Sequence, residues 1–282
     1  MPERPTITSP ANPRVKWAAR LRAKARQRRR EGVLLAEGAR EVGRAAAAGL
    51  RPVAWFGCAE LLGEDQGPLL GVPGVPGVEP TWVSAAVLRK LTFHDRPEGQ
   101  VAVFETPSWS LEDLELGDDA LLLVAVGTEK PGNLGAMTRT AAAAGCAAVV
   151  AVGPAIDVFG PSAIRNSTGA VFTLPVVVIE DAATAIDWLK DHRVRIVAAV
   201  ADGPGSDADD CFTWPGWAAG RCGVVVGPEH AGLDDTWRDA ADTQLHIPQA
   251  TGPHGGGVDS LNASNAAAVL LFEAVRRRQA SG

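Results

Sequence analysis

From residue 120 onward, short continuous apolar runs alternate with segments of helical periodicity. Three of these runs end in glycine: ALLLVAVG (120–127), AAVVAVG (147–153) and RCGVVVG (221–227). A strand that is buried on both faces of a parallel sheet has this kind of uninterrupted apolar sequence. A helical segment follows each run, and repeated strand–helix alternation is typical of an α/β domain. The sequence therefore predicts an α/β domain with a mostly parallel sheet over residues 120–282.

The first hundred residues show a shorter version of the same alternation. The segment ANPRVKWAARLRAKARQRRR (11–30) has its apolar residues at helical spacing, and short strand-like and helical segments follow it as far as VAVFE (101–105). We expect a small α/β domain over residues 1–106. The stretch 107–119 is polar, acidic and weakly periodic, which is typical of a linker.

Charge is distributed unevenly along the chain. The formal net charge is −6, which by itself argues against a nucleic-acid partner. Residues 1–30, however, hold ten Lys or Arg and one acidic residue, whereas the rest of the chain holds 17 basic and 32 acidic residues. A concentrated basic segment on an acidic body is typical of a protein that docks onto a polyanion. A solvated helix face is the alternative, because the whole composition favours Arg over Lys.

Other features disfavour several classes of protein. No apolar run approaches the roughly eighteen residues of a membrane span, and the first residues lack the apolar core of a secretory signal. We therefore expect a cytoplasmic protein. The cysteines and histidines lack metal-ligand spacing, so we expect free buried thiols and no metal site. The cysteines are Cys58, Cys146, Cys211 and Cys222.

The loop after the first long apolar run has an unusual glycine-rich sequence. Ligands of parallel sheets bind beyond the carboxyl ends of the strands, so such loops are the first place to look for a site. GTEKPGNLGAMTRTAAAAG (127–145) matches neither the dinucleotide-binding signature nor the P-loop. With Asn133 as the helix cap, Arg139 lies in the second turn, directly before a run of alanines. It is either a surface arginine with a buried stem or a guanidinium turned into a cleft.

Two later loops also follow strands. In VVVGPEHAGL (224–233), Gly227 ends a buried strand and Glu229 lies in the turn after it. In LHIPQATGPHGGGVDSLNASNAAA (245–268), a strand and a glycine-rich loop lead into a helix. One helix start needs one capping side chain, and this one has four. They are Ser260, Asn262, Ser264 and Asn265.

Taken in order, these loops resemble the motifs of a known family. N-x-G-A-x-x-R-T-A-x-x-x-G from Asn133, V-G-x-E-x-x-G-L from Val226 and I-P-x…D-S-L-N-x-S-x-A-A-A from Ile247 resemble the three successive motifs of the SpoU/TrmH family of RNA ribose 2′-O-methyltransferases, in the SPOUT superfamily. IRNSTGAVFTLPV (164–176) is similar to the family segment between the first two motifs. The third motif is longer than the family pattern, the excess lying in TGPHGGG (251–257).

The resemblance implies a fold, a cofactor and a set of site residues. The fold is an α/β sheet whose C-terminal segment passes through a loop and forms a deep trefoil knot. S-adenosylmethionine lies bent in this knot and leaves as S-adenosylhomocysteine, and each active site lies at the interface of a homodimer. The implied cofactor-binding residues are Gly227, Ile247, Ser260, Leu261 and Asn262. The implied catalytic residues are Asn133, Arg139, Glu229, Ser260 and Asn262.

RNA is the partner that the resemblance implies. The N-terminal hundred residues resemble the RNA-binding extension of the family's ribosomal RNA members. Candidates for phosphate binding in the basic segment are Arg22, Arg26, Arg29 and Arg30. Ribosomal RNA is the expected substrate, and transfer RNA is the alternative. Some members confer resistance to antibiotics such as thiostrepton, but they share these motifs with housekeeping enzymes, so both roles stay open.

The implied reaction moves a methyl group from a sulfonium ion to a ribose hydroxyl. A guanidinium stays protonated in proteins, so Arg139 suits a charge role better than the role of a base. We expect it to grip a phosphate and to stabilise developing alkoxide charge. A non-catalytic ribosome-assembly factor is the main alternative from another class. A nicotinamide or nucleotide enzyme is disfavoured because both glycine signatures are missing.

Overall fold

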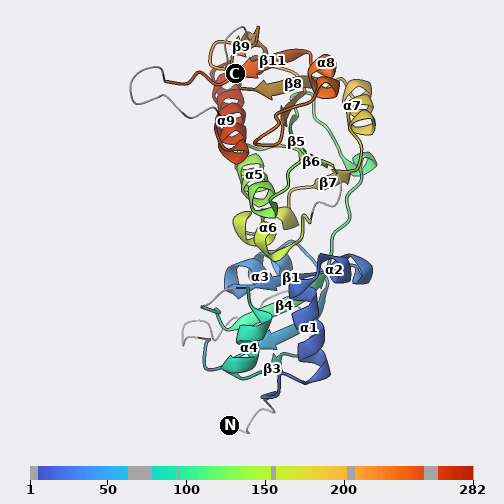
Figure 1. Ribbon diagram of the computed structural model, residues 1–282, viewed down its shortest axis with the longest axis vertical. Coiled ribbons are helices and arrows are strands. Elements are labelled where there is room, and N and C mark those ends of the chain that lie inside the picture. The colour runs from blue at the N-terminus through green and yellow to red at the C-terminus, as the bar shows by residue number, and fades with distance from the viewer. Residues whose placement is uncertain are drawn as a thin grey trace. The chain divides into compact units, whose positions relative to one another are not determined.

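The protein is described by a computed structural model that covers residues 6–62, 78–93, 96–153, 157–201, 207–250 and 260–281 (Figure 1). The chain forms two compact units. The first unit contains Met1–Pro107 and Asp157–Thr173, and the second contains Ser108–Ile156 and Leu174–Gly282. Within the described ranges, no helix combines the length and the apolar character that a membrane crossing requires.

The first unit is built on a mixed four-stranded sheet in the order β1-β4-β2-β3. Its central strand β4 runs antiparallel to β1 and β2, while β2 and β3 run parallel. The strands are β1 (Val33–Glu37), β2 (Pro52–Gly57), β3 (Thr81–Trp82) and β4 (Gln100–Glu105). The helices are α1 (Pro13–Ala23), α2 (Ala25–Glu31), α3 (Gly38–Ala47), α4 (Ala85–Leu91) and α6 (Pro161–Asn166), with a 3₁₀ turn at η3 (Ala170–Phe172).

The basic segment 11–30, for which we expected one helix, forms two. The first, α1, starts at an Asn12 cap and stops at Lys24, whose backbone is extended, and α2 begins directly after it. The last carbonyls of a helix lack partners in the helix itself. Arg28 of α2 is the hydrogen-bond donor for two of these carbonyls. Its Nη1 donates to the carbonyl of Leu21 at 2.5 Å and to the carbonyl of Arg22 at 3.1 Å. Arg28 is therefore buried, and it joins the two helices.

The second unit contains a seven-stranded sheet in the order β7-β6-β5-β10-β8-β11-β9, and neighbouring strands run parallel throughout. The strands are β5 (Leu121–Val126), β6 (Ala148–Val152), β7 (Val176–Ile179), β8 (Arg195–Val200), β9 (Asp209–Asp210), β10 (Cys222–Val226) and β11 (Thr243–His246). The helices are α5 (Pro131–Ala143), α7 (Ala182–Asp191), α8 (Asp235–Ala240) and α9 (Ala263–Ser281), with 3₁₀ turns at η2 (Leu111–Asp113) and η4 (Pro215–Ala218). The predicted α/β class with a mostly parallel sheet is confirmed, and the knot stays a prediction.

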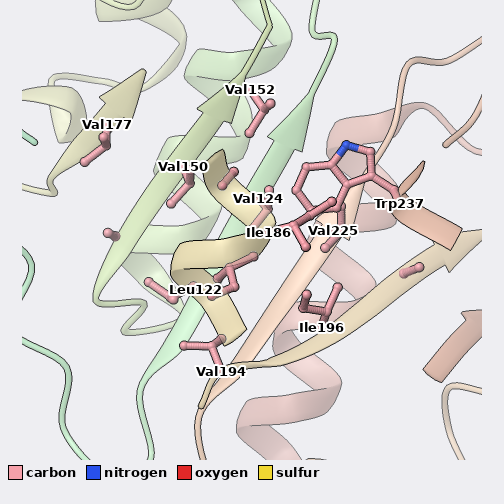
Figure 2. Packing of buried hydrophobic residues seen from close by; sticks show 14 of the residues in the cluster. Leu122, Val124, Val150, Val152, Val177, Ile186, Val194, Ile196, Val225 and Trp237 are labelled. Atoms are coloured by element: carbon pink, nitrogen blue, oxygen red, sulfur yellow. The ribbon is translucent and has the colours of Figure 1, made fainter. Parts of the chain in front are cut away.

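The central strands of this sheet are apolar on both faces. Leu122 and Val124 of β5 and Val225 of β10 are fully buried, and they pack with Ile196 and Trp237 in one core (Figure 2). The strands β5 and β10 lie side by side in parallel register, with Ala125 opposite Val226. Because their carboxyl ends meet at one edge, the loops that follow them are neighbours. This register places the first two sequence motifs together.

The segment 107–119, for which we expected a linker, packs against the second unit's core. Leu111 is buried there, and Trp109, Leu114 and Leu116 are partly buried against the same cluster. The short turn η2 is fixed by Ser110 and Asp113, which cap it reciprocally. A segment with weak periodicity thus contributes four apolar side chains to the core.

Candidate active site

A pocket of about 390 Å³ lies at the carboxyl edge of the large sheet. Its walls come from the ends of β8, β10 and β11, the loop after β10, and the start of α9. Four of the five predicted cofactor-binding residues line it. They are Gly227, Ile247, Ser260 and Leu261. The fifth, Asn262, follows directly in the chain and contacts Glu229, which also lines the pocket.

Gly227 allows the chain to fold back tightly at this pocket. A Cβ atom at this position would lie 2.7 Å from the carbonyl carbon of Gly232 and 2.8 Å from the backbone nitrogen of Leu233. Backbone atoms cannot yield as a flexible side chain can, so only glycine fits this turn. The loop from Pro228 to Leu233 therefore packs directly on the end of β10 and forms one wall of the pocket.

Glu229 connects three segments that are distant in sequence. Its Oε1 accepts a hydrogen bond from Asn133 Nδ2 at 2.8 Å and another from Asn262 Nδ2. Its Oε2 accepts one from Lys130 Nζ at 3.1 Å. We call these four residues the Glu229 cluster. They join the loop after β5, the loop after β10 and the start of α9.

The start of α5 explains how Asn133 enters this cluster. The helix begins at Pro131, whose missing N–H costs nothing at the first helical position, and Lys130 occupies the cap position. From the sequence we predicted Asn133 at the cap position. In the structure it lies in the first turn of the helix instead. From this position its Nδ2 donates to Glu229.

The surroundings of Glu229 favour its ionised form. The hydrogen bond from Lys130 lowers the pKa of this carboxyl most strongly, followed by the bond from Asn133, and the charges of Lys130 and His230 act in the same direction. Desolvation opposes them, although the side chain keeps 21% of its exposure. Because the folded-state pKa of Glu229 is lowered, its ionised carboxylate stabilises the folded chain at pH values above the unfolded-state pKa of the glutamate. That stability is lost as the pH falls through the folded-state value.

Asn262 combines two roles at the start of α9. Its Oδ1 accepts from the backbone N–H of Ser264 at 2.9 Å and from the Ser264 hydroxyl at 2.5 Å, which caps the helix. Its Nδ2 donates to Glu229 in the cluster. Three of the four polar residues at this helix start thus have a structural account. Asn262 caps the helix and donates to Glu229, the Ser264 hydroxyl donates to Asn262, and Ser260 lines the pocket.

Arg139 lies apart from the other predicted catalytic residues. It projects from α5 into solvent, two turns beyond Asn133, and does not line the pocket. Within the described part of the chain its guanidinium makes no hydrogen bond or ion pair. A single chain therefore assembles Asn133, Glu229, Ser260 and Asn262 and leaves the predicted arginine outside.

The basic segment of the first unit presents most of its cations to solvent. Arg26, Arg29 and Arg30 are exposed, whereas Arg22 is half-buried and donates to the Thr92 carbonyl at 2.7 Å. Arg28, which is only 5% exposed, also pairs with Asp157. Three of the four candidate phosphate-binding arginines thus face solvent, although Arg30 lies 3.4 Å from the Glu31 carboxylate. The fourth is engaged in the fold.

Comparison with known proteins identifies the family of the chain. The model of the SpoU rRNA methylase family matches residues 120–272, which is more than half of the chain. The chain belongs to the SpoU rRNA methylase family. This confirms the resemblance that the three motifs indicated. An MRM3-like substrate binding domain matches residues 12–102.

The relatives of this SpoU family member carry related names. A 23S rRNA (uridine(2479)-2′-O)-methyltransferase from Streptomyces viridochromogenes is 34% identical over 191 residues, which are 66% of this chain and 62% of that relative. A 23S rRNA (guanosine-2′-O-)-methyltransferase, RlmB, from Ralstonia nicotianae is 34% identical over 68% of this chain and 74% of its own length. The chain thus matches slightly under two thirds of the first relative and about three quarters of the second.

Solved structures are similar over nearly the whole chain. The crystal structure of an RNA 2′-O ribose methyltransferase superimposes with a TM-score of 0.83 at 39% identity, covering 98% of this chain and 100% of that one. AviRb from Streptomyces viridochromogenes, in complex with the cofactor AdoMet, gives a TM-score of 0.82 at 29% identity, with coverage of 96% and 100%. The shared fold therefore extends through both units.

Sequence reasoning missed one member of the Glu229 cluster. Lys130 lies three residues before Asn133, the first residue of the first motif, and nothing in its spacing separates it from an ordinary surface lysine. The one signal in the sequence was its place after a buried strand, in the loop that faces the β10 loop. The contact depends on the pairing of β5 with β10, which local sequence does not reveal.

The dual role of Asn262 leads to a stability prediction. Asn262→Ala should lower the free energy of unfolding by about 1 kcal/mol, the usual effect of removing a helix cap. Asn265→Ala is the matched control, because Asn265 is an exposed residue of the same helix whose side chain caps nothing. Urea denaturation of both variants measures the difference. Equal stability of the two variants would show that the Asn262 side chain does not cap α9.

Proposed function

We propose that this chain transfers the methyl group of S-adenosylmethionine to a ribose 2′-hydroxyl of ribosomal RNA, acting as a cytoplasmic homodimer. Family membership and the names of the relatives support the reaction class. The observation that carries the proposal is the Glu229 cluster beside the pocket. It assembles three motif segments from distant parts of the chain at one edge of the sheet.

The pocket suits the cofactor in size and chemistry. Its volume of about 390 Å³ is within the range of small-molecule sites. Leu245, Ile247 and Leu270 supply apolar walls for an aromatic base, and Ser260 and Gln249 supply polar groups. When bound, S-adenosylmethionine supplies an activated methyl group on a sulfonium centre. The chain's own task is therefore alignment and charge stabilisation.

Arg139 is the residue that we assign to charge stabilisation. A guanidinium keeps its proton, so it cannot act as a base on the ribose hydroxyl. It binds a phosphate next to the target ribose and stabilises the negative charge that develops on the attacking oxygen. Glu229, Ser260 and Asn262 hold the pocket wall and the ribose in place, and Asn133 fixes the loop after β5.

A homodimer accounts for the position of Arg139. The helices α5 and α9 pack side by side in the second unit (Figure 1). Phe272 of α9 is 48% exposed, and Arg139 on α5 is exposed as well. A second copy seated on these helices would cover Phe272 and bring Arg139 to the partner's pocket. Light scattering should then give twice the chain mass of 29.3 kDa.

Ribosomal RNA is favoured over transfer RNA by two observations. The first unit matches a substrate binding domain, and the named relatives act on 23S rRNA. The exposed arginines of α2 supply cations for the RNA backbone. A non-catalytic assembly factor is the competing function, and the intact catalytic set argues against it. Resistance and housekeeping roles share the same chemistry, so the biological role depends on the target nucleotide.

The deciding experiment incubates the protein with methyl-labelled S-adenosylmethionine and deproteinised ribosomal RNA, then maps labelled ribose by mass spectrometry. One 2′-O-methylated nucleotide is the expected result. If a parallel incubation labels transfer RNA and ribosomal RNA stays unlabelled, the substrate is transfer RNA and the proposed reaction stands. If calorimetry detects no cofactor binding and no RNA is labelled, the assembly-factor function replaces this one.

Arg139→Ala should reduce kcat by about 100-fold or more, as removal of a group that stabilises developing charge does. Cofactor affinity should stay unchanged, because Arg139 is assigned to the RNA phosphate and the attacking oxygen and not to the cofactor. Lys190→Ala is the control, since Lys190 is an exposed cation on α7 of the same unit. Single-turnover methylation and calorimetry measure the two quantities. Retained turnover in Arg139→Ala would remove this residue from the mechanism.

Replacing Arg26, Arg29 and Arg30 together by glutamine should weaken RNA binding and flatten its salt dependence. Removing one arginine–phosphate ion pair reduces the steepness of log K against log salt by roughly one. Binding is measured by fluorescence anisotropy across a salt series, with Lys190→Gln as the control. A slope equal to that of the wild type would make these arginines a solvated surface without an RNA role.

A further inference from the structure

One charged residue of the Glu229 cluster has no role in the function proposed above. Lys130 stands at the cap position of α5, and its ammonium group lies 3.1 Å from Glu229 Oε2. We propose that Lys130 is a positioning residue of the methyltransferase centre. It holds the Glu229 carboxylate as the common acceptor of the cluster and thereby sets the lowest pH at which the centre stays assembled. This inference rests on the methyltransferase function proposed above.

The hydrogen-bond pattern of the cluster requires an ionised carboxylate. Asn133 and Asn262 both present amide nitrogens, which only donate, and Lys130 presents an ammonium group, which also only donates. An ionised carboxylate accepts on both oxygens. A protonated one carries a hydrogen on one oxygen, and that hydrogen would face a donor. Protonation of Glu229 removes its negative charge and part of its acceptor capacity, and therefore weakens its hydrogen bonds to the three donors.

Charged groups around Glu229 come from two loops. Glu129 and Lys130 belong to the loop after β5, and His230 belongs to the loop after β10, and all three line a small pocket with Glu229. Lys130 is the cation that pairs with the carboxylate, and its hydrogen bond is the largest cause of the lowered Glu229 pKa. The N-terminus of α5 adds positive potential at the same place. Glu129 has the opposite sign and cannot replace Lys130.

The exposure of Lys130 separates a positioning role from a structural one. Its side chain is 67% exposed, and ion pairs at such positions contribute little to the stability of a fold. Loss of Lys130 should therefore leave the melting temperature near that of the wild type. The effect should appear in the pH dependence of the reaction instead, because Glu229 then becomes protonated at higher pH.

The test compares wild type, Lys130→Met, Lys130→Arg and the control Lys190→Met. The ratio kcat/KM for methyl transfer is measured from about pH 3.5 to about pH 7, because the Glu229 pKa is held below the ordinary glutamate value of about 4.3. Lys130→Met should lose severalfold in kcat/KM on the acid side and recover toward the wild-type value at high pH. Lys130→Arg should restore the acid side, and Lys190→Met should follow the wild type throughout.

A second readout keeps the test independent of turnover. Calorimetry measures cofactor affinity as a function of pH, and Lys130→Met should lose affinity on the acid side. Glu229→Gln removes the titrating group. In that background, adding Lys130→Met should cause no acid-side loss of cofactor affinity. An acid limb at the same pH in Lys130→Met and wild type would overturn the inference, as would failure of Lys130→Arg to rescue. These outcomes differ from failure of the proposed function, in which the wild type itself neither binds the cofactor nor methylates RNA.

Discussion

The parallel pairing of β5 with β10 is the constraint on which the rest of the site depends. Their fixed register brings two carboxyl ends to one edge of the sheet, so the loops after them face each other. Lys130 and Asn133 arrive from one loop and Glu229 from the other. The helix α9 completes the arrangement by packing on α5, which delivers Asn262 to the same carboxylate. The three hydrogen bonds that Glu229 accepts thus depend on the strand order of the sheet.

The sequence predicted those parts of the molecule that are encoded locally. Apolar runs such as 120–127 marked buried strands, and Gly227 and Glu229 stood out because the order of the motifs was specific. The sequence did not reveal that Asn133 lies inside the helix rather than at its cap, because the helix starts earlier, at Pro131. Lys130 was missed because its partner Glu229 lies in the loop after another strand, and pairing across a sheet has no local signature.

Charge composition proved a poor guide to individual arginines. The basic segment looks uniform, but Arg28 is buried and completes the end of α1, while its neighbours Arg29 and Arg30 are exposed. Backbone carbonyls left free at a helix end need a donor, and a long guanidinium on the next helix can reach them. The break at Lys24 creates that need. Segment charge therefore predicts a binding surface without saying which residues belong to it.

The packing of residues 108–119 has a consequence for any attempt to isolate the catalytic half. The family match begins at residue 120, but Trp109, Leu111, Leu114 and Leu116 cover the core from outside that boundary. A fragment starting at 120 would leave apolar core residues open to water, and such surfaces drive aggregation. A fragment that keeps this apolar cluster covered therefore has to include Trp109. In this protein the family match begins twelve residues inside the compact unit that starts at Ser108.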